Sequence, residues 1–133
     1  MIGAIVAVHV ALATGRVNGD SILGRNVAQV EAVFGRPVSV ERYPVRRDLL
    51  FHGIEVIFGN GKTASAYVVT GVARPAALRA ELSATPGLRE SRRYRCDAKG
   101  CFGTFFAQNG KRRVIYGLNR GSPYLGEQAW PQP

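Results

Sequence analysis

Apolar and polar positions alternate along most of the chain in the pattern of half-buried β-strands, interrupted by two short segments with helical spacing. In the first segment, Val27, Val30 and Phe34 share one helical face, and Gly35 ends it. Asn26 is a suitable N-cap for this helix. Strand-like segments follow at 38–45, 49–58 and 62–70. This order predicts a short helix followed by an antiparallel three-stranded meander.

The same order returns in the second half of the chain. Pro75 suits a first helical turn, and Pro86 stops the helix. Between them, Leu78 and Leu82 supply an apolar face. Three more strand-like segments lie at 88–96, 101–108 and 111–119. A second helix and a second meander are therefore predicted.

The two halves also align with each other, 22–70 on 71–119 at an offset of 49 residues. The identities fall mainly at turns, where Asn60-Gly61 matches Asn109-Gly110, and each pair predicts a two-residue hairpin. The alignment predicts an α+β fold of two tandem helix-plus-antiparallel-meander repeats, 15–70 and 71–121. The repeats would form a sheet with the helices on one face, which leaves the opposite face open.

The two ends of the chain differ from the repeats. Residues 1–14 are apolar but too few to span a membrane, and Ala11 and Ala13 resemble a cleavage site. This segment is interpreted as a truncated signal peptide or leader, or else as a buried part of the fold. Residues 122–133 contain three prolines and no periodicity, which predicts an extended or disordered tail. Three apolar residues of this tail are able to dock back onto the sheet: Tyr124, Leu125 and Trp130.

Cys96 and Cys101 flank a turn-forming tetrapeptide between two strand-like segments. A disulfide across this hairpin fits an oxidising compartment, so the sequence predicts a secreted, periplasmic or cell-surface protein. Two free thiols or half of a zinc site are the alternatives. Zinc needs four ligands, and besides the cysteines the chain offers only His9 and His52. We therefore expect no metal and no cofactor.

Little in the sequence points to catalysis. His52 stands in an apolar run, and Ser21 lacks the second glycine of a nucleophile elbow. The Gly-Lys-Thr segment at 61–63 lacks the earlier glycine and the following helix of a phosphate-binding loop. No spacing brings together the three candidate carboxylates, Glu41, Asp48 and Glu55. We expect neither enzyme activity nor nucleotide binding.

Charge is the feature that composition adds. The 133 residues are 46% hydrophobic and 20% charged, which fits a globular chain and excludes a disordered or collagen-like one. The net charge is +9; residues 1–70 hold 7 basic and 5 acidic residues, and residues 71–133 hold 11 and 4. The excess therefore lies mainly in the second half. It predicts attraction to an acidic protein or envelope component, or to nucleic acid.

Partner contact is predicted on the open sheet face, because aromatic residues flanked by arginines are typical of protein-binding surfaces. The candidates are Phe51, Tyr67, Tyr94, Phe106 and Tyr116, with Arg92, Arg93 and Arg95 attracting an acidic partner. The alternative is polyanion binding through the second repeat, where the basic run 111–113 joins these arginines beside Tyr94 and Phe102. No nucleic-acid motif accompanies the basic residues, so nucleic acid is not the expected partner.

The sequence Leu-Gly-Arg-Asn-Val-Ala-Gln-Val-Glu-Ala-Val-Phe-Gly-Arg-Pro at 23–37, with Gly-Ile-Glu-Val-Ile-Phe-Gly-Asn-Gly-Lys at 53–62, resembles the SmpA/OmlA (BamE-like) outer-membrane assembly lipoproteins. It is also similar in unit design to the β-lactamase inhibitor protein group, where the unit is duplicated. The resemblance covers residues 22–70 well and the second repeat weakly. It implies an exported, non-catalytic module that binds a protein or an envelope component with its sheet.

Two features of those families have no counterpart here. No cysteine follows the leader to carry a lipid, and no motif matches the partner-binding residues of the inhibitors. The predicted function is thus a secreted or cell-envelope protein-binding module, inhibitor-like or envelope-assembly-like, without a membrane span. A basic polyanion-binding module is the alternative.

Overall fold

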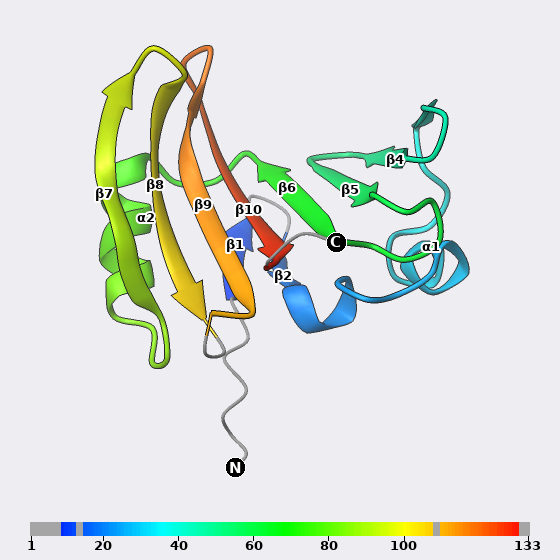
Figure 1. Ribbon diagram of the computed structural model, residues 1–133, viewed down its shortest axis with the longest axis horizontal. Coiled ribbons are helices and arrows are strands. Elements are labelled where there is room, and N and C mark those ends of the chain that lie inside the picture. Colours follow the sequence, from blue (N-terminus) through cyan, green and yellow to red (C-terminus); the bar gives the residue numbers. More distant parts are fainter. Residues whose placement is uncertain (1–8, 13–14, 108–109, 131–133) are drawn as a thin grey trace.

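The computed structural model describes residues 9–12, 15–107 and 110–130. Eight strands form one antiparallel sheet in the order β3-β4-β5-β6-β10-β9-β8-β7 (Figure 1). The first half of the sheet consists of β3 (Ser39–Arg42), β4 (Arg47–Phe51), β5 (Ile54–Phe58) and β6 (Ala66–Thr70). The second half consists of β7 (Arg89–Asp97), β8 (Gly100–Ala107), β9 (Arg112–Asn119) and β10 (Ser122–Ala129). A separate ladder pairs β1 (His9–Leu12) with β2 (Gly15–Asn18).

Two α-helices, α1 (Val27–Phe34) and α2 (Pro75–Ser83), and the 3-10 turn η1 (Gly19–Ser21) complete the described chain. A capping box starts α1: Gln29 N–H donates to Asn26 Oδ1 at 2.8 Å, and Asn26 N–H donates to Gln29 Oε1 at 2.9 Å. Arg74, the N-cap residue of α2, makes no such bond, and this helix begins on Pro75.

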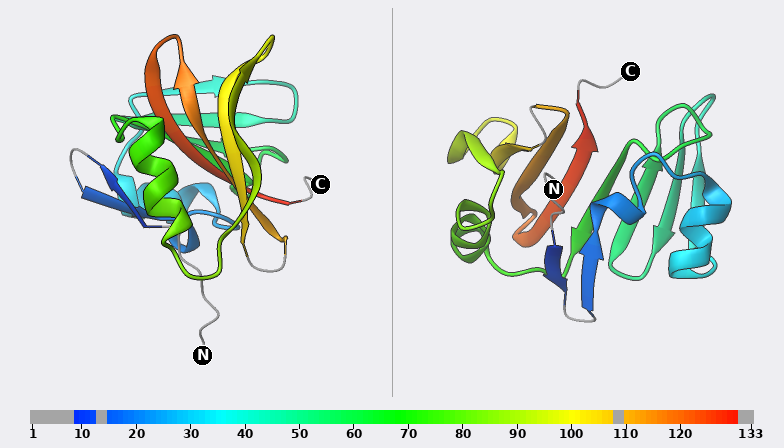
Figure 2. Two further views of the ribbon diagram at one scale, coloured as in Figure 1. Left: turned by 90° about the vertical axis from the view of Figure 1, so that its left-hand side faces the viewer. Right: turned by 90° about the horizontal axis from the view of Figure 1, so that it is seen from below.

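Both helices pack on the same face of the sheet (Figure 2). Val30 of α1 is buried on alternate residues of β5 and β6, among them Tyr67 and Val69. Leu78 and Leu82 of α2 are buried on a second cluster that includes Leu125. Val69 and Leu125 are cross-strand partners and therefore point to the same side. We call the opposite side the open face, because none of the described helices covers it.

The predicted α+β fold of two helix-plus-three-stranded-meander repeats is wrong. One eight-stranded sheet dominates, and four strands follow each helix. The offset of 49 residues also aligns strands that occupy different places. Tyr67 lies on β6, the strand of the first half at the junction with the second half. Tyr116 lies on β9, which is the second strand from that junction, because β10 stands between it and β6. Turns favour the same residue types wherever they occur, so identities at turns do not establish equivalent positions.

Residues 122–129 of the predicted tail form β10 in the middle of the sheet, so this segment is not disordered, and Tyr124 and Leu125 belong to the sheet as the docking alternative expected. Leu125, Gly126 and Glu127 are buried there. The link from β5 to β6 is longer than the expected two-residue hairpin, and in it Asn60 Oδ1 accepts the N–H groups of Lys62 and Thr63. The second expected hairpin includes residues outside the described part of the chain. So does most of the predicted leader, 1–14, of which only β1 is described.

Candidate functional site

Aromatic and basic side chains lie side by side on the open face of the second half. Phe105 and Val114 face α2, so their sequence neighbours on β8 and β9 point to the open face. Cross-strand pairing extends this surface to β7. Its principal side chains are Arg92 and Arg95 of β7, Phe102 and Phe106 of β8, and Arg113 of β9.

Two of these arginines lie over aromatic rings. The Arg92 guanidinium carbon lies 3.6 Å from the centre of the Phe102 ring, and Arg92 Nη2 donates to Asp97 Oδ2 at 3.0 Å. The Arg113 guanidinium carbon lies 4.7 Å from the centre of the Trp130 ring, which also contacts Phe106 with 6.0 Å between ring centres. Stacking of this kind orients a guanidinium while its edge stays able to donate hydrogen bonds.

A cleft of about 440 Å³ opens on the same face, where the two halves of the sheet meet. Glu55 and Val68 of the first half line one side of it, and Phe102 and Lys99 of the second half line the other. Three strands separate β5 from β8 in the sheet order, yet Glu55 and Phe102 share this cleft. The sheet therefore curves toward its open face.

Gly117 accounts for part of this hollow. It pairs with Phe102 on one side and with Tyr124 on the other, so no side chain stands between the two rings. A Cβ atom at this position would lie 2.1 Å from the carbonyl oxygen of Cys101. Only glycine allows β8 and β9 to approach this closely.

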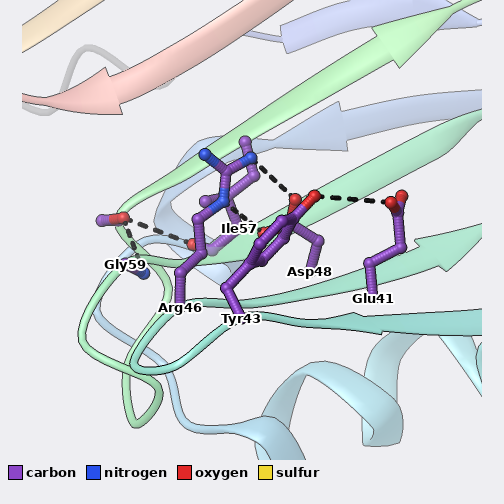
Figure 3. Close-up of polar contacts among 7 residues, drawn as sticks. Glu41, Tyr43, Arg46, Asp48, Ile57 and Gly59 are labelled. Carbon is purple, nitrogen blue, oxygen red and sulfur yellow. Dashed lines mark hydrogen bonds and ion pairs between the residues drawn. The ribbon is translucent and has the colours of Figure 1, made fainter.

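Three carboxylates cross the first half of the open face. Glu41 of β3 pairs with Asp48 of β4, and Glu55 of β5 lies diagonally beyond. Figure 3 shows Arg46 directed at Asp48, where its Nε and Nη2 donate to the two carboxylate oxygens at 2.8 and 2.7 Å. Tyr43 donates its hydroxyl proton to Glu41 at 3.4 Å. The sequence spacing did not predict this convergence, which depends on the register of β3, β4 and β5.

Glu55 differs from its neighbours because it makes no ion pair with any described residue. Burial raises the pKa of Glu55, and the hydrogen bond and negative charge of Asp48 raise it further. Asp48, by contrast, is almost completely buried but is neutralised by Arg46. Glu55 thus lies at the cleft without an ion-pair partner among the described residues, although the charge of Arg46, which is paired with Asp48, acts on it and partly offsets this rise in its pKa.

The predicted aromatic residues do not gather on the open face. Tyr67 and Tyr116 are 1% and 0% exposed in the core, so neither can contact a partner. Phe51 packs on Phe34 of α1 with 5.3 Å between ring centres, and Tyr94 stacks on Tyr116 at 5.9 Å. Only Phe106 among the five lies on the open face. The other four were misplaced because alternation indicates which residues share a face, but not which of the two faces the helices cover.

The predicted arginines are divided between the two faces. Arg92 and Arg95 pair with Thr104 and Phe102 on the open face, but Arg93 lines a small pocket beside α2. The register of β7 shifts on both sides of Arg92, which brings Arg92 and Arg95 to one side although three positions separate them. A regular strand would have grouped Arg93 with Arg95 instead.

The predicted disulfide is confirmed. Cys96 and Cys101 are cross-strand partners and are bonded to each other at the end of the β7–β8 hairpin. The turn that they close contributes Lys99 and Gly100 to the wall of the cleft. The disulfide therefore holds one side of the cleft in place.

Sequence reasoning missed Glu55 and Tyr124 as members of the site. Both line the cleft, and burial raises the pKa of Tyr124, which keeps its hydroxyl protonated. The alternation of residues 54–58 was the available signal for the side that Glu55 faces, whereas residues 124–128 do not alternate and gave no such signal for Tyr124.

Neither a metal centre nor a membrane helix emerges from the described part of the chain. Within it, no three His, Cys, Asp or Glu residues are grouped to hold a metal ion. The helices described there are too short to cross a bilayer.

No family model, curated protein or solved structure matches this chain.

Proposed function

We propose that this protein is a secreted or cell-envelope, non-catalytic protein-binding module whose open face contacts an acidic surface of its partner. The observation that carries the proposal is the arrangement of Arg92 on Phe102 at 3.6 Å and of Arg113 on Trp130 at 4.7 Å, on the face that no described helix covers. Arginine and tryptophan are enriched among the residues that dominate binding energy at protein interfaces.

Two physical features support this role. Stacked guanidinium groups lose less side-chain entropy when a carboxylate binds them than free arginines do. The charge of residues 71–133, with 11 basic and 4 acidic residues, attracts an acidic partner at long range.

The disulfide favours an oxidising compartment. The resemblance to envelope-assembly and inhibitor proteins supports an assembly-like or inhibitor-like task.

Affinity capture from cell-envelope extract tests the proposal when it compares matched variants. Arg92→Glu/Arg113→Glu reverses two charges on the open face. Arg36→Glu/Arg74→Glu reverses two exposed charges at α1 and α2 and serves as the control. We expect the wild type and the control to retain the same acidic protein, and the open-face variant to retain at least about tenfold less. Equal retention by all three folded proteins, or no acidic protein at all, would contradict the proposal.

Polyanion binding is the second candidate, because Arg89, Arg92 and Arg95 follow one another along the open face of β7. Retention on heparin or DNA that falls steeply between low and physiological salt would favour it, provided that Arg92→Glu/Arg113→Glu abolishes retention. Retention with a shallow salt dependence would count against it.

A further inference from the structure

The cleft holds chemistry that an acidic partner surface does not use. Its two aromatic rings, Phe102 and Tyr124, stand on either side of Gly117, and Glu55 lies on the opposite wall. Glu55 has no ion-pair partner among the described residues: Asp48 lies on the next strand, Glu41 lies one strand further, and Arg46, whose charge also acts on Glu55, is already paired with Asp48. A negative charge in this setting is unfavourable unless a cation approaches it.

We propose that the cleft receives an arginine side chain of the protein partner, with its guanidinium directed at the Glu55 carboxylate. A planar guanidinium stacks on aromatic rings and also donates paired hydrogen bonds to a carboxylate. The methylene groups of an arginine match the apolar parts of the wall, such as Val68. This inference rests on the proposed function and specifies the partner surface.

The open face therefore carries negative charge in its first half and positive charge in its second half. The carboxylate row Glu41, Asp48 and Glu55 contains one paired arginine, Arg46, and is negative overall. The second half presents Arg92, Arg95 and Arg113. A partner that fits both halves carries an acidic patch with an arginine beside it, and Lys99 at the cleft favours an acidic residue next to that arginine. A uniform polyanion is repelled by the carboxylate row.

The first test uses a small probe on the intact protein. N-acetylarginine methylamide is titrated while backbone amide signals are followed by NMR, with N-acetylcitrulline methylamide as the uncharged control of the same shape. We expect saturable shifts for Thr70, Gly100, Phe102 and Tyr124, with a dissociation constant of the order of 1 mM for the arginine probe alone. Absence of saturable shifts, or equal shifts with both probes, would overturn the inference.

Two variants identify the carboxylate responsible. Glu55→Gln keeps the shape of the cleft wall and should weaken arginine binding at least about fivefold. Glu41→Gln removes an exposed carboxylate that does not line the cleft, and should change binding by less than about twofold. Equal effects of the two variants would show a diffuse charge effect and contradict a specific arginine site.

Acid pH should weaken the arginine probe in the wild type but not in Glu55→Gln. Besides Tyr124, four titratable or charged groups face Glu55 or its cleft: Glu41 of β3, Asp48 of β4, Arg46 before β4, and Lys99 of the β7–β8 turn. Tyr124 of β10 also lines the cleft, and β6 contributes Val68 and Thr70, which do not titrate. Because burial and Asp48 raise the pKa of Glu55, affinity should fall at a pH above the usual range for glutamate.

The capture experiment separates failure of this inference from failure of the proposed function. If Arg92→Glu/Arg113→Glu abolishes capture and Glu55→Gln does not weaken it, the arginine site is wrong and the proposed function stands. If Arg92→Glu/Arg113→Glu captures as well as wild type, the proposed function fails regardless of the probe titration.

Discussion

In each half of the sheet, one face is apolar and packs on a helix, but the two halves differ in the sign of the charge on the open face. In the first half, α1 covers a cluster that includes Val56 and Phe58; in the second, α2 covers one that includes Phe105 and Val114. Both helix faces are mostly apolar, because both are buried, and the buried Glu127 is an exception that Tyr67 and Arg112 hold by hydrogen bonds. The open face need not be apolar. There the first half carries three carboxylates, and the second half carries arginines and aromatic rings. The difference between the halves therefore lies on the face that we propose for partner contact.

The halves are also held together by different means. A full capping box fixes the start of α1, which buries only Val30, while α2 has no side-chain cap and buries Pro75, Leu78 and Leu82. The second half has the disulfide and the two stacked arginines as well. Its edge strand β7 has nine residues, whereas the edge strand β3 of the first half has four, all of them exposed. The half that carries the proposed contact surface is thus the more constrained one.

The junction of the halves gives the largest expected effect. Tyr67 of β6 donates to Glu127 Oε1 at 2.8 Å, and Arg112 of β9 donates to Glu127 Oε2 at 3.4 Å, with Glu127 1% exposed on β10. Glu127→Ala should cost about 3–5 kcal/mol in the free energy of unfolding, because it removes one partner of a buried charged group. Urea unfolding measures this cost.

Two further variants sharpen this result. Glu127→Gln keeps an acceptor for Tyr67 but removes the charge facing Arg112, and should lie between wild type and Glu127→Ala. Glu81→Ala, at an exposed position of α2, should change stability by about 0.5 kcal/mol or less. If Glu127→Ala lowers the free energy of unfolding no more than Glu81→Ala does, Glu127 does not join the two halves.

Loss of the disulfide should affect the second half more than the first. Cys96→Ser/Cys101→Ser should lower the free energy of unfolding by about 2 kcal/mol, since the closed loop is short. Hydrogen exchange should show reduced protection at amides of β7 and β8, with little change in β4 and β5. His52→Ala, in the turn between β4 and β5, is the matched control in the first half. Equal loss of protection in both halves would contradict the difference in constraint.

Local signals predicted the local structure well. The helix spacing and Asn26 located α1, Pro75 located the start of α2, and the spacing of Cys96 and Cys101 indicated the disulfide. Each of these depends on residues close together in sequence. β10 was missed because Pro123 and Gly126 interrupt the alternation that marks a strand.

Non-local pairing accounts for the rest of what sequence could not predict. The position of β10 between β6 and β9 depends on contacts between distant segments, and so does the face that each strand presents to the helices. The shifted register of β7 moved Arg93 away from the predicted surface. The carboxylate row required the pairing of Glu41 with Asp48 and the neighbouring position of Glu55. A single sequence contains no measure of these registers.

The smallest expected effect compares one carboxylate from each half. Burial and Asp48 raise the pKa of Glu55, so its ionised form opposes folding above that pKa, and the cost disappears below the ordinary glutamate value of about 4.3. The hydrogen bond from Arg79 lowers the pKa of Glu90, so its ionised form favours folding above the ordinary value, and this stabilisation is lost as the pH falls.

Substitution by glutamine should therefore have opposite signs in the two halves at pH 7. Glu55→Gln should stabilise the protein by about 0.5 kcal/mol or less. Glu90→Gln should destabilise it by about 0.2–1 kcal/mol, the range for exposed ion pairs. Both differences should fade when urea unfolding is repeated at steps down to pH 3, where the wild-type carboxyl groups take up protons. Destabilisation by Glu55→Gln at pH 7 would mean that a cation of this chain already neutralises Glu55, and the cleft would then have no unpaired charge to offer an arginine.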